Sequence, residues 1–354
     1  MIPTFLYIYA REHLGRMITI QKQIQLKKRP TGVPTYDHFE FVEVPIEKPA
    51  KGEILLQTVY ISVDPYLRGR MNDTKSYIPP FKLNEAISSG VIGKVVESKS
   101  DLFDVGDFVI GSLGWQEFSI AKDSTVRKID PNLAPVSAYL SVLGMTGLTA
   151  YFGLLDIGKP KAGETVVVSG AAGAVGSIVG QIAKIKGARV VGIAGSDEKV
   201  RYLLDDLGFD AAINYNTQDV GSALKEACPD GIDVYFENVG GEISDAIFPL
   251  LNNFARIPVC GAISAYNQSE PDVGPRVQGY LIKTSSLMQG FTIGNYSSRF
   301  GEGAKELAGW LLEGKLKYEE TVTEGFENTI DAFLDLFKGA NLGKAIVKVA
   351  DSDK

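Results

Sequence analysis

The clearest pattern of hydrophobic and polar positions lies between residues 164 and 197, where two apolar runs flank a segment of helical periodicity. Thr165–Ser169 is rich in β-branched residues, as in a parallel strand buried on both faces. A turn follows, Gly187 marks the end of the periodic segment, and residues 188–194 form the second run. Between them, apolar residues recur at helical spacing at Val175, Ile178, Val179 and Ile182. The pattern predicts a βαβ unit.

Three glycines in the first turn have the spacing of a dinucleotide-binding site. Gly170 lets the chain turn, Gly173 leaves room for a pyrophosphate beside the backbone, and Gly176 lets the helix pack closely on the strand. Because a strand precedes this turn and a helix follows it, we expect a bound dinucleotide. The alternative is a turn built from small residues for steric reasons alone.

The end of the second strand indicates which dinucleotide. NAD-binding sites usually place an acidic residue there, whereas this chain has Gly195-Ser196. The small residue leaves room for a 2′-phosphate, to which Ser196, Lys199 and, after the third strand, Tyr215 can donate. Ser196 is also the expected N-cap of the next helix. These residues predict NADP(H). In the alternative reading Ser196 only caps, Lys199 is solvated and Asp197 binds a ribose.

The pattern of predicted secondary structure differs between two parts of the chain. From Met17 to about residue 141, short strand-like runs alternate with turns, as in a small antiparallel β domain: Glu53–Tyr60, Gly90–Glu97, Asp107–Ile110 and Glu117–Ile120. Strands and helices then alternate, the further strands being Ala211–Asn214, Asp233–Phe236, Ala255–Cys260 and Met288–Thr292. A helix over 328–337 and a strand over 344–349 return to the first domain.

These two patterns predict an α/β protein in which one domain is inserted into another. The inserted domain, residues 147–316, has a doubly wound parallel sheet, and the β-barrel-like domain around it comprises residues 17–146 and 317–354. Residues 1–16 precede a credible start at Met17, and we expect them to be an N-terminal extension. Ligands should bind in the crevice between the two domains.

Composition narrows the function. The net charge of −7 argues against a nucleic-acid surface, and no apolar run reaches the ~20 residues that span a bilayer. The two cysteines, Cys228 in an expected surface stretch and Cys260 at a strand end, fit a reducing cytosol.

A catalytic zinc is not expected, because it needs three protein ligands in one place. The chain offers only His13, His38, Cys228 and Cys260, at scattered positions. The chemistry must then rest on the nicotinamide and ordinary side chains. Without a metal, hydride addition to a conjugated enone is more plausible than reduction of a saturated ketone, because hydroxyl donors can hold the delocalised enolate.

Five further segments make the chain recognisable: residues 62–71, 143–151, 171–176, 237–241 and 259–267. With them the chain resembles the medium-chain dehydrogenase/reductase superfamily. Within it, the match is to zinc-free double-bond reductases, the group of the prostaglandin/leukotriene, plant alkenal and bacterial curcumin reductases. The resemblance implies a Rossmann domain and a GroES-like domain.

The resemblance also implies roles for individual residues. The pyrophosphate would be held by Gly173, Ala174, Val175 and Gly176, and the 2′-phosphate by Lys199 and Tyr215. Thr146 would contact the carboxamide end, Tyr66 and Tyr266 would face the substrate, and Arg68 would stabilise its own loop. The nicotinamide half would be lined by Asn238, Cys260, Gly261, Ala262, Ile263, Ser264, Phe291, Thr292, Ile293 and Asn341.

The expected reaction is NADPH-dependent reduction of the C=C bond of α,β-unsaturated ketones or aldehydes. Tyr266 and the nicotinamide ribose hydroxyl would hold the enolate oxygen. A phenol with a pKa of ~10 suits hydrogen bonding better than obligatory proton donation. The alternatives are a quinone reductase and a non-catalytic NADPH-binding interaction protein. We expect a cytoplasmic enzyme without nucleic-acid or membrane partners, and the resemblance implies a homodimer.

Overall fold

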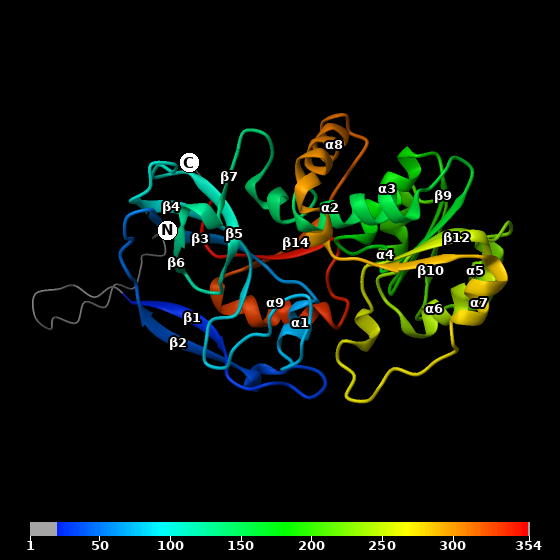
Figure 1. Cartoon of the computed structure of the whole chain (residues 1–354), viewed down its shortest axis with the longest axis horizontal. Coiled ribbons are helices and arrows are strands. Elements are labelled where there is room, and N and C mark those ends of the chain that lie inside the picture. Colours follow the sequence, from blue (N-terminus) through cyan, green and yellow to red (C-terminus); the bar gives the residue numbers. More distant parts are fainter. Residues whose placement is uncertain (1–19, 353–354) are drawn as a thin grey trace, which may run out of the picture.

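The structure is a computed structural model that describes residues 20–352, and it has two lobes side by side (Figure 1). One contains a six-stranded parallel sheet and the other a mainly antiparallel sheet. The predicted fold class is thereby confirmed. Residues 1–16, the expected extension, lie outside the described residues, and the domain boundaries expected at 147 and 316 stay predictions.

The parallel sheet has the strand order β10-β9-β8-β11-β12-β13, which is the 3-2-1-4-5-6 order of the Rossmann fold. Ligands of such sheets bind beyond the carboxyl ends of the strands, where β8 and β11 lie side by side and the winding reverses. The strands are β8 (Thr165–Ser169), β9 (Arg189–Ala194), β10 (Ala211–Asn214), β11 (Ile232–Phe236), β12 (Leu251–Val259) and β13 (Leu287–Gly290).

The centre of this sheet is buried on both faces, because alternate residues of its strands enter different cores, whereas the edge strand β13 has exposed residues. Val166 and Val168 of β8 join the core under one helical layer, and Val167 joins the other. The first layer contains α2 (Met145–Phe152), α3 (Gly176–Ile185) and α8 (Phe300–Leu312). The second contains α5 (Val220–Ala227), α6 (Gly241–Ile247) and α7 (Gln278–Thr284), while the short α4 (Asp197–Arg201) follows β9.

The other lobe is built on a seven-stranded sheet of order β14-β15-β3-β4-β5-β7, with β6 paired to β3. A separate hairpin, β1 (Ile20–Leu26) and β2 (Phe39–Pro45), and the short α1 (Leu67–Arg70) complete it. The remaining strands are β3 (Glu53–Ser62), β4 (Ser88–Ser98), β5 (Phe108–Gly114), β6 (Phe118–Lys122), β7 (Arg127–Ile129), β14 (Glu320–Glu324) and β15 (Lys344–Lys348).

The C-terminal segment, shown in red in Figure 1, returns to the lobe that contains the antiparallel sheet. β15 pairs antiparallel with β3 and parallel with β14. The helix α9 (Thr329–Leu336) brings Phe333 against the buried Trp115 and Phe39, with ring centroids 5.9 and 6.2 Å apart. The C-terminal segment therefore completes the hydrophobic core of the lobe that the N-terminal segment forms.

Several sequence predictions needed correction. The pattern missed the hairpin β1–β2 and the strands β7 and β14, and it placed the ends of β12 and β13 one to four residues away from where they lie. Cys228 is not on the surface: it is the C-cap residue of α5, is 4% exposed and packs in the core. The prediction of a surface position rested on the neighbours Pro229 and Asp230, which are exposed, whereas the side chain of Cys228 turns inward.

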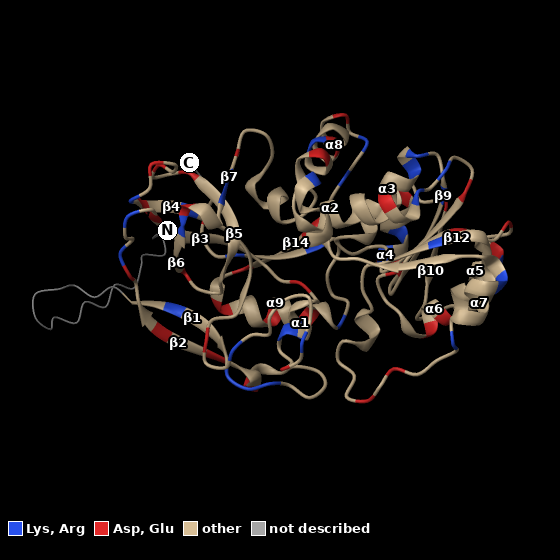
Figure 2. Ribbon diagram, in the orientation of Figure 1, with Lys and Arg blue, Asp and Glu red and all other residues tan. Residues whose placement is uncertain are grey.

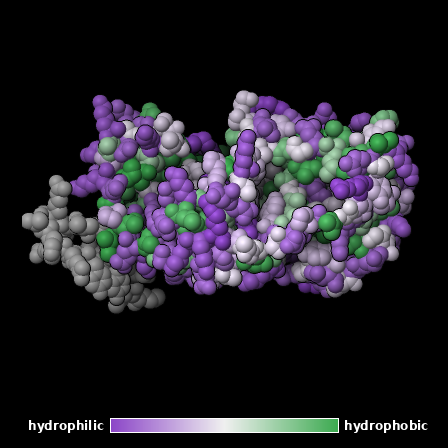
Figure 3. Space-filling model, turned by 60° about the horizontal axis from the view of Figure 1, so that its bottom comes forward, coloured by the Kyte–Doolittle hydropathy of each residue, from purple (hydrophilic) through white to green (hydrophobic). Residues whose placement is uncertain are grey.

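Charged residues of both signs are interspersed over both lobes (Figure 2). On the face drawn in Figure 3, hydrophobic residues form small groups among hydrophilic ones. Within residues 20–352, no helix has the length and apolar character needed to cross a membrane.

Phe209 is locked between the first helix and the second strand of the parallel sheet by two glycines. A Cβ atom on Gly180 of α3 would lie 1.9 Å from the Phe209 ring, and one on Gly192 of β9 would lie 2.9 Å from it. The Phe209 side chain is buried, with 4% of its surface exposed. This contact fixes how closely α3 approaches the sheet.

Gly180→Ala should therefore destabilise the protein by about 1–3 kcal/mol, because the added methyl overpacks the Phe209 site. Gly309→Ala is the matched control, since Gly309 lies in α8 with open space around it. There the better helix propensity of alanine should stabilise by up to ~1 kcal/mol. Urea unfolding of both variants is the measurement, and a neutral Gly180→Ala would contradict the packing argument.

Candidate active site

A cleft of about 1220 Å³ runs between the two lobes, across the carboxyl ends of the parallel strands. All but two of the predicted cofactor and substrate residues line it. The exceptions are Ser196 and Ala262, which instead bond to the cleft-lining residues Lys199 and Tyr266. The cleft exceeds the usual 300–1,000 Å³ of a small-molecule pocket, as a site for a dinucleotide and a second ligand should.

The glycine turn after β8 forms the floor at the middle of the cleft. Gly176 begins α3, and a Cβ there would lie 2.4 Å from the carbonyl oxygen of Gly170, so a larger residue would push helix and strand apart. Gly173, Ala174 and Val175 line the cleft at the N-terminus of α3. This arrangement fits a pyrophosphate, because the helix end favours an anion.

Gly195, Lys199 and Tyr215 line another part of the cleft. Ser196 caps α4, its Oγ accepting from the backbone N–H of Lys199 at 3.2 Å. The Tyr215 hydroxyl packs over Gly195, where a Cβ would lie 2.7 Å from it. Asp197 accepts from Asn214 Nδ2 at 2.7 Å and is not among the cleft-lining residues. The alternative in which Asp197 binds a ribose is therefore disfavoured.

Lys199 makes a contact that the sequence did not predict. Its Nζ donates to the carbonyl oxygen of Gly339, in the other lobe, at 2.6 Å. Burial lowers the pKa of the Lys199 ammonium. The ammonium carries three N–H donors, so two remain for a phosphate.

A buried carboxylate shapes the loop after β11. Glu237 is 3% exposed, and its Oε1 accepts from the Tyr235 hydroxyl at 2.6 Å and from the backbone N–H groups of Val239 and Gly240 at 2.9 and 2.7 Å. The next residue, Asn238, donates its Nδ2 to the carbonyl oxygen of Ser169 at 2.8 Å. Glu237 thus folds the loop that places Asn238 in the cleft.

Tyr266 lies at the end of a loop that follows β12. Its hydroxyl accepts from the backbone N–H of Ala262 at 3.3 Å, and a Cβ on Gly261 would approach it to 2.9 Å. Burial raises the pKa of Tyr266 above its ordinary value. The phenol therefore stays protonated at neutral pH, and its proton is free to donate into the cleft.

Tyr66 faces the cleft from the other lobe, one residue before α1. Burial and the nearby carboxylate of Asp64 raise its pKa well above the ordinary value, so it too is a neutral hydroxyl. Asp64 forms an ion pair with Lys344 at 3.2 Å, and both side chains are almost completely buried. The two other Lys344 donors reach the carbonyl oxygens of Val63 and Ala345, at 2.8 and 2.7 Å.

The other predicted residues take up different parts of the cleft wall. Thr146 is buried and donates its hydroxyl to the carbonyl oxygen of Ser141 at 3.0 Å, while Asn341 donates to that of Gly343 at 2.8 Å. Burial and the carboxylate of Glu237 raise the pKa of the Cys260 thiol to about 12, which leaves it a weak nucleophile. Gly261, Ile263, Ser264, Phe291, Thr292 and Ile293 line the same wall.

Sequence reasoning missed Asp64, Lys344 and Tyr77. Tyr77 lies at the rim, 68% exposed, in a loop whose path no local pattern predicts. A lysine at the head of the apolar strand β15 was the available signal for Lys344, because an ammonium is buried only with partners. Its partner Asp64 lies 280 positions earlier, so the pair could not be recognised locally.

The two lobes are joined by main-chain contacts at the floor of the cleft. Gly343, just before β15, donates its N–H to the carbonyl oxygen of Ala172 in the glycine turn at 2.8 Å, and it forms a parallel bridge with Gly173. Gly343 has φ +63°, and a Cβ there would lie 2.0 Å from the carbonyl oxygen of Glu319. Only glycine fits this junction.

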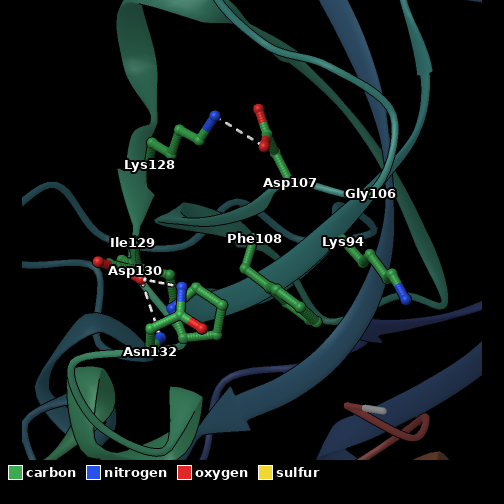
Figure 4. A pocket seen from close by; sticks show the side chains of 9 residues that line it. Lys94, Gly106, Asp107, Phe108, Lys128, Ile129, Asp130 and Asn132 are labelled. Atoms are coloured by element: carbon green, nitrogen blue, oxygen red, sulfur yellow. Dashed lines mark hydrogen bonds and ion pairs between the residues drawn. The ribbon is translucent and has the colours of Figure 1, made fainter. Parts of the chain in front are cut away.

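A second hollow lies on the outside of the lobe that contains the antiparallel sheet, and several of the side chains that line it bond to one another (Figure 4). Lys128 is paired with Asp107 at 2.7 Å, and Asp130 folds back on Asn132 at 2.8 Å. None of the predicted site residues lies there. His38 lies elsewhere on this lobe, bonded to Thr35, and His13 is outside the described residues. Within residues 20–352, no group of three or more His, Cys, Asp or Glu is arranged to hold a metal ion.

Comparison with known proteins agrees with this architecture. Family models described as "N-terminal domain of oxidoreductase" and "Zinc-binding dehydrogenase" match residues 22–129 and 174–309. The putative NADP-dependent oxidoreductase YfmJ of Bacillus subtilis is 66% identical over 95% of this chain and 99% of its own. NADPH-dependent curcumin reductase of Escherichia coli is 45% identical over 96% and 100%.

A solved structure also matches: CurA of Vibrio vulnificus in complex with NADPH has a TM-score of 0.89 and 45% identity, over 93% of this chain and 99% of that one. The resemblance noted in the sequence is thereby confirmed. The chain belongs to the medium-chain dehydrogenase/reductase superfamily, in the group that includes the curcumin reductases.

Proposed function

We propose that this protein is an NADPH-dependent reductase of the C=C bond of α,β-unsaturated ketones and aldehydes. The observation that carries this proposal is the pair of neutral tyrosine hydroxyls, Tyr66 and Tyr266, on opposite walls of a cleft that also holds a dinucleotide-binding turn. The relatives named NADP-dependent oxidoreductase and NADPH-dependent curcumin reductase support the same class of reaction.

The residues present fit NADP(H). The close approach at Gly176, the N-terminus of α3 and the donors Lys199 and Tyr215 form one track along the cleft. Thr146, Asn238, Cys260 and Asn341 line the same cleft, and we propose that they hold the nicotinamide half. Bound there, the cofactor supplies a hydride to the β-carbon of the substrate.

Tyr266 meets the charge that develops on the substrate oxygen. The Ala262 N–H occupies a lone pair of its hydroxyl oxygen, which leaves the O–H free to donate to an enolate. Because its pKa is raised, Tyr266 stabilises this oxyanion by hydrogen bonding more readily than by proton transfer. The α-carbon takes its proton from solvent or from Tyr266. Since the oxyanion is delocalised, we propose that turnover needs no metal.

The subunits would associate through the free edge of the parallel sheet. β13 is the terminal strand, and Ile282 of α7 and Leu287 of β13 are 79% and 49% exposed beside it. An exposed strand edge with apolar neighbours readily pairs with a second copy. We propose a homodimer that extends this sheet, acting in the cytoplasm, where the free thiols Cys228 and Cys260 stay reduced.

NADPH should be preferred over NADH by more than tenfold in kcat/KM. Lys199→Ala should raise the KM for NADPH by about tenfold or more, because a charge-assisted bond to the 2′-phosphate is lost. Turnover with NADH, which lacks that phosphate, is the control and should change little. Equal use of both cofactors by the unmodified protein would contradict the phosphate site.

The reaction itself is tested with a trans-2-alkenal or an aryl enone beside a quinone, after prolonged incubation with a chelator. Tyr266→Phe should lower kcat for the enone about tenfold to a few hundredfold, because the lost donor acts mainly in the transition state. The affinity for NADPH should change little, and quinone reduction should suffer less. A wild-type rate in Tyr266→Phe would make the tyrosine only a wall of the cleft, and loss of activity with the chelator would contradict the metal-free mechanism.

Sedimentation velocity should show a dimer. Ile282→Glu combined with Leu287→Glu should convert it to a monomer, because two carboxylates would be buried in the interface. Leu102→Glu is the control, since Leu102 is 68% exposed on the other lobe. A dimer that resists the double change would place the interface elsewhere.

A further inference from the structure

Arg68 is a buried cation in the segment that follows the cleft-lining Tyr66. It lies in α1, two residues after Tyr66, and is 2% exposed. Its guanidinium donates to the carbonyl oxygens of Pro30 and Gly32 at 3.3 and 2.8 Å, and to Asn72 Oδ1 at 2.8 Å. These bonds fix Arg68 within its own lobe, as the expectation that it stabilises its loop requires.

One further bond of Arg68 crosses the cleft. Its Nε donates to Asn267 Oδ1 at 3.1 Å while also pointing to the Gly32 carbonyl oxygen at 3.2 Å. Asn267 belongs to the Rossmann lobe and directly follows Tyr266. The loops are also in contact beside this bond, because a Cβ on Gly32 would lie 3.7 Å from the carbonyl oxygen of Asn267. Arg68 is thus two residues from Tyr66 in the chain and bonds to the residue that follows Tyr266.

The placement gives this contact a geometric consequence. Tyr66 leads into α1 and Tyr266 leads into Asn267, so the Arg68–Asn267 bond is one short step along the chain from each hydroxyl-bearing residue. Arg68 is held rigidly by three carbonyl or amide oxygens of its own lobe. The separation of the two tyrosines therefore depends on whether Asn267 stays docked on the guanidinium.

We propose that Arg68 is a positioning residue that holds Tyr66 and Tyr266 at their working separation by binding Asn267 across the cleft. This inference rests on the proposed function, in which both tyrosines face the substrate. Its partners in the described part of the chain are neutral oxygens, so a carboxylate at position 267 would strengthen the contact.

Asn267→Ala is the decisive variant, because it removes the cross-cleft acceptor and leaves the other bonds of Arg68 in place. We expect kcat/KM for the enone to fall about tenfold, the usual effect of losing a hydrogen bond to a charged group. The dissociation constant for NADPH should stay within about twofold of the unmodified protein, since no bond of the glycine turn is touched. Asn267→Asp should retain the unmodified activity by offering Arg68 a carboxylate oxygen.

Asn328→Ala is the matched control. Its Nδ2 donates to the carbonyl oxygen of Glu324 at 2.7 Å, away from the cleft, so it loses one side-chain amide bond without a cross-lobe contact. It should leave both constants unchanged. If Asn267→Asp is as impaired as Asn267→Ala, or if NADPH binding weakens in parallel with enone turnover, the role of Asn267 is local and the proposal is wrong.

Hydrogen exchange separates this proposal from the proposed function. Asn267→Ala should speed amide exchange in peptides spanning residues 28–38, which belong to the other lobe, as well as in its own loop. Asn328→Ala should change neither region. Unchanged exchange over 28–38 would overturn the cross-cleft contact, whereas a protein that exchanges as expected but reduces no enone would overturn only the reaction.

Discussion

The junction between Gly343 and the glycine turn is the constraint on which the site depends. A single main-chain bond to Ala172, at 2.8 Å, places the start of β15 against the turn that would hold the pyrophosphate. The same strand carries Lys344, whose ammonium anchors Asp64 and with it the segment that leads to Tyr66. One backbone contact therefore relates the substrate-facing wall of one lobe to the cofactor-binding floor of the other.

Much of the fold could be predicted because its signals are local. Thr165–Ser169, the three glycines and the helical spacing that begins at Val175 lie within a few turns of chain, and Ser196 caps α4 as its position before an acidic turn suggests. Burial of both faces at the centre of the parallel sheet follows from the apolar runs of β8 and β9. Most of the residues that the family resemblance named line the cleft.

The parts that could not be predicted depend on contacts between distant segments. The Asp64–Lys344 pair, the Lys199–Gly339 bond and the Arg68–Asn267 bond each join residues more than a hundred positions apart. Nothing in the sequence around either partner identifies the other. Cys228 failed for a related reason: its polar neighbours describe the path of the backbone, but tertiary packing decides where one small side chain points.

The bond between Lys199 and Gly339 has a consequence for redesign. The side chain that we propose recognises the 2′-phosphate also donates to the backbone of the opposite lobe. On this proposal, cofactor choice and one contact between the lobes depend on the same amino group. A protein variant selected for the unphosphorylated cofactor could lose this contact between the lobes together with the phosphate recognition, because the bond from Gly343 to Ala172 still joins the lobes.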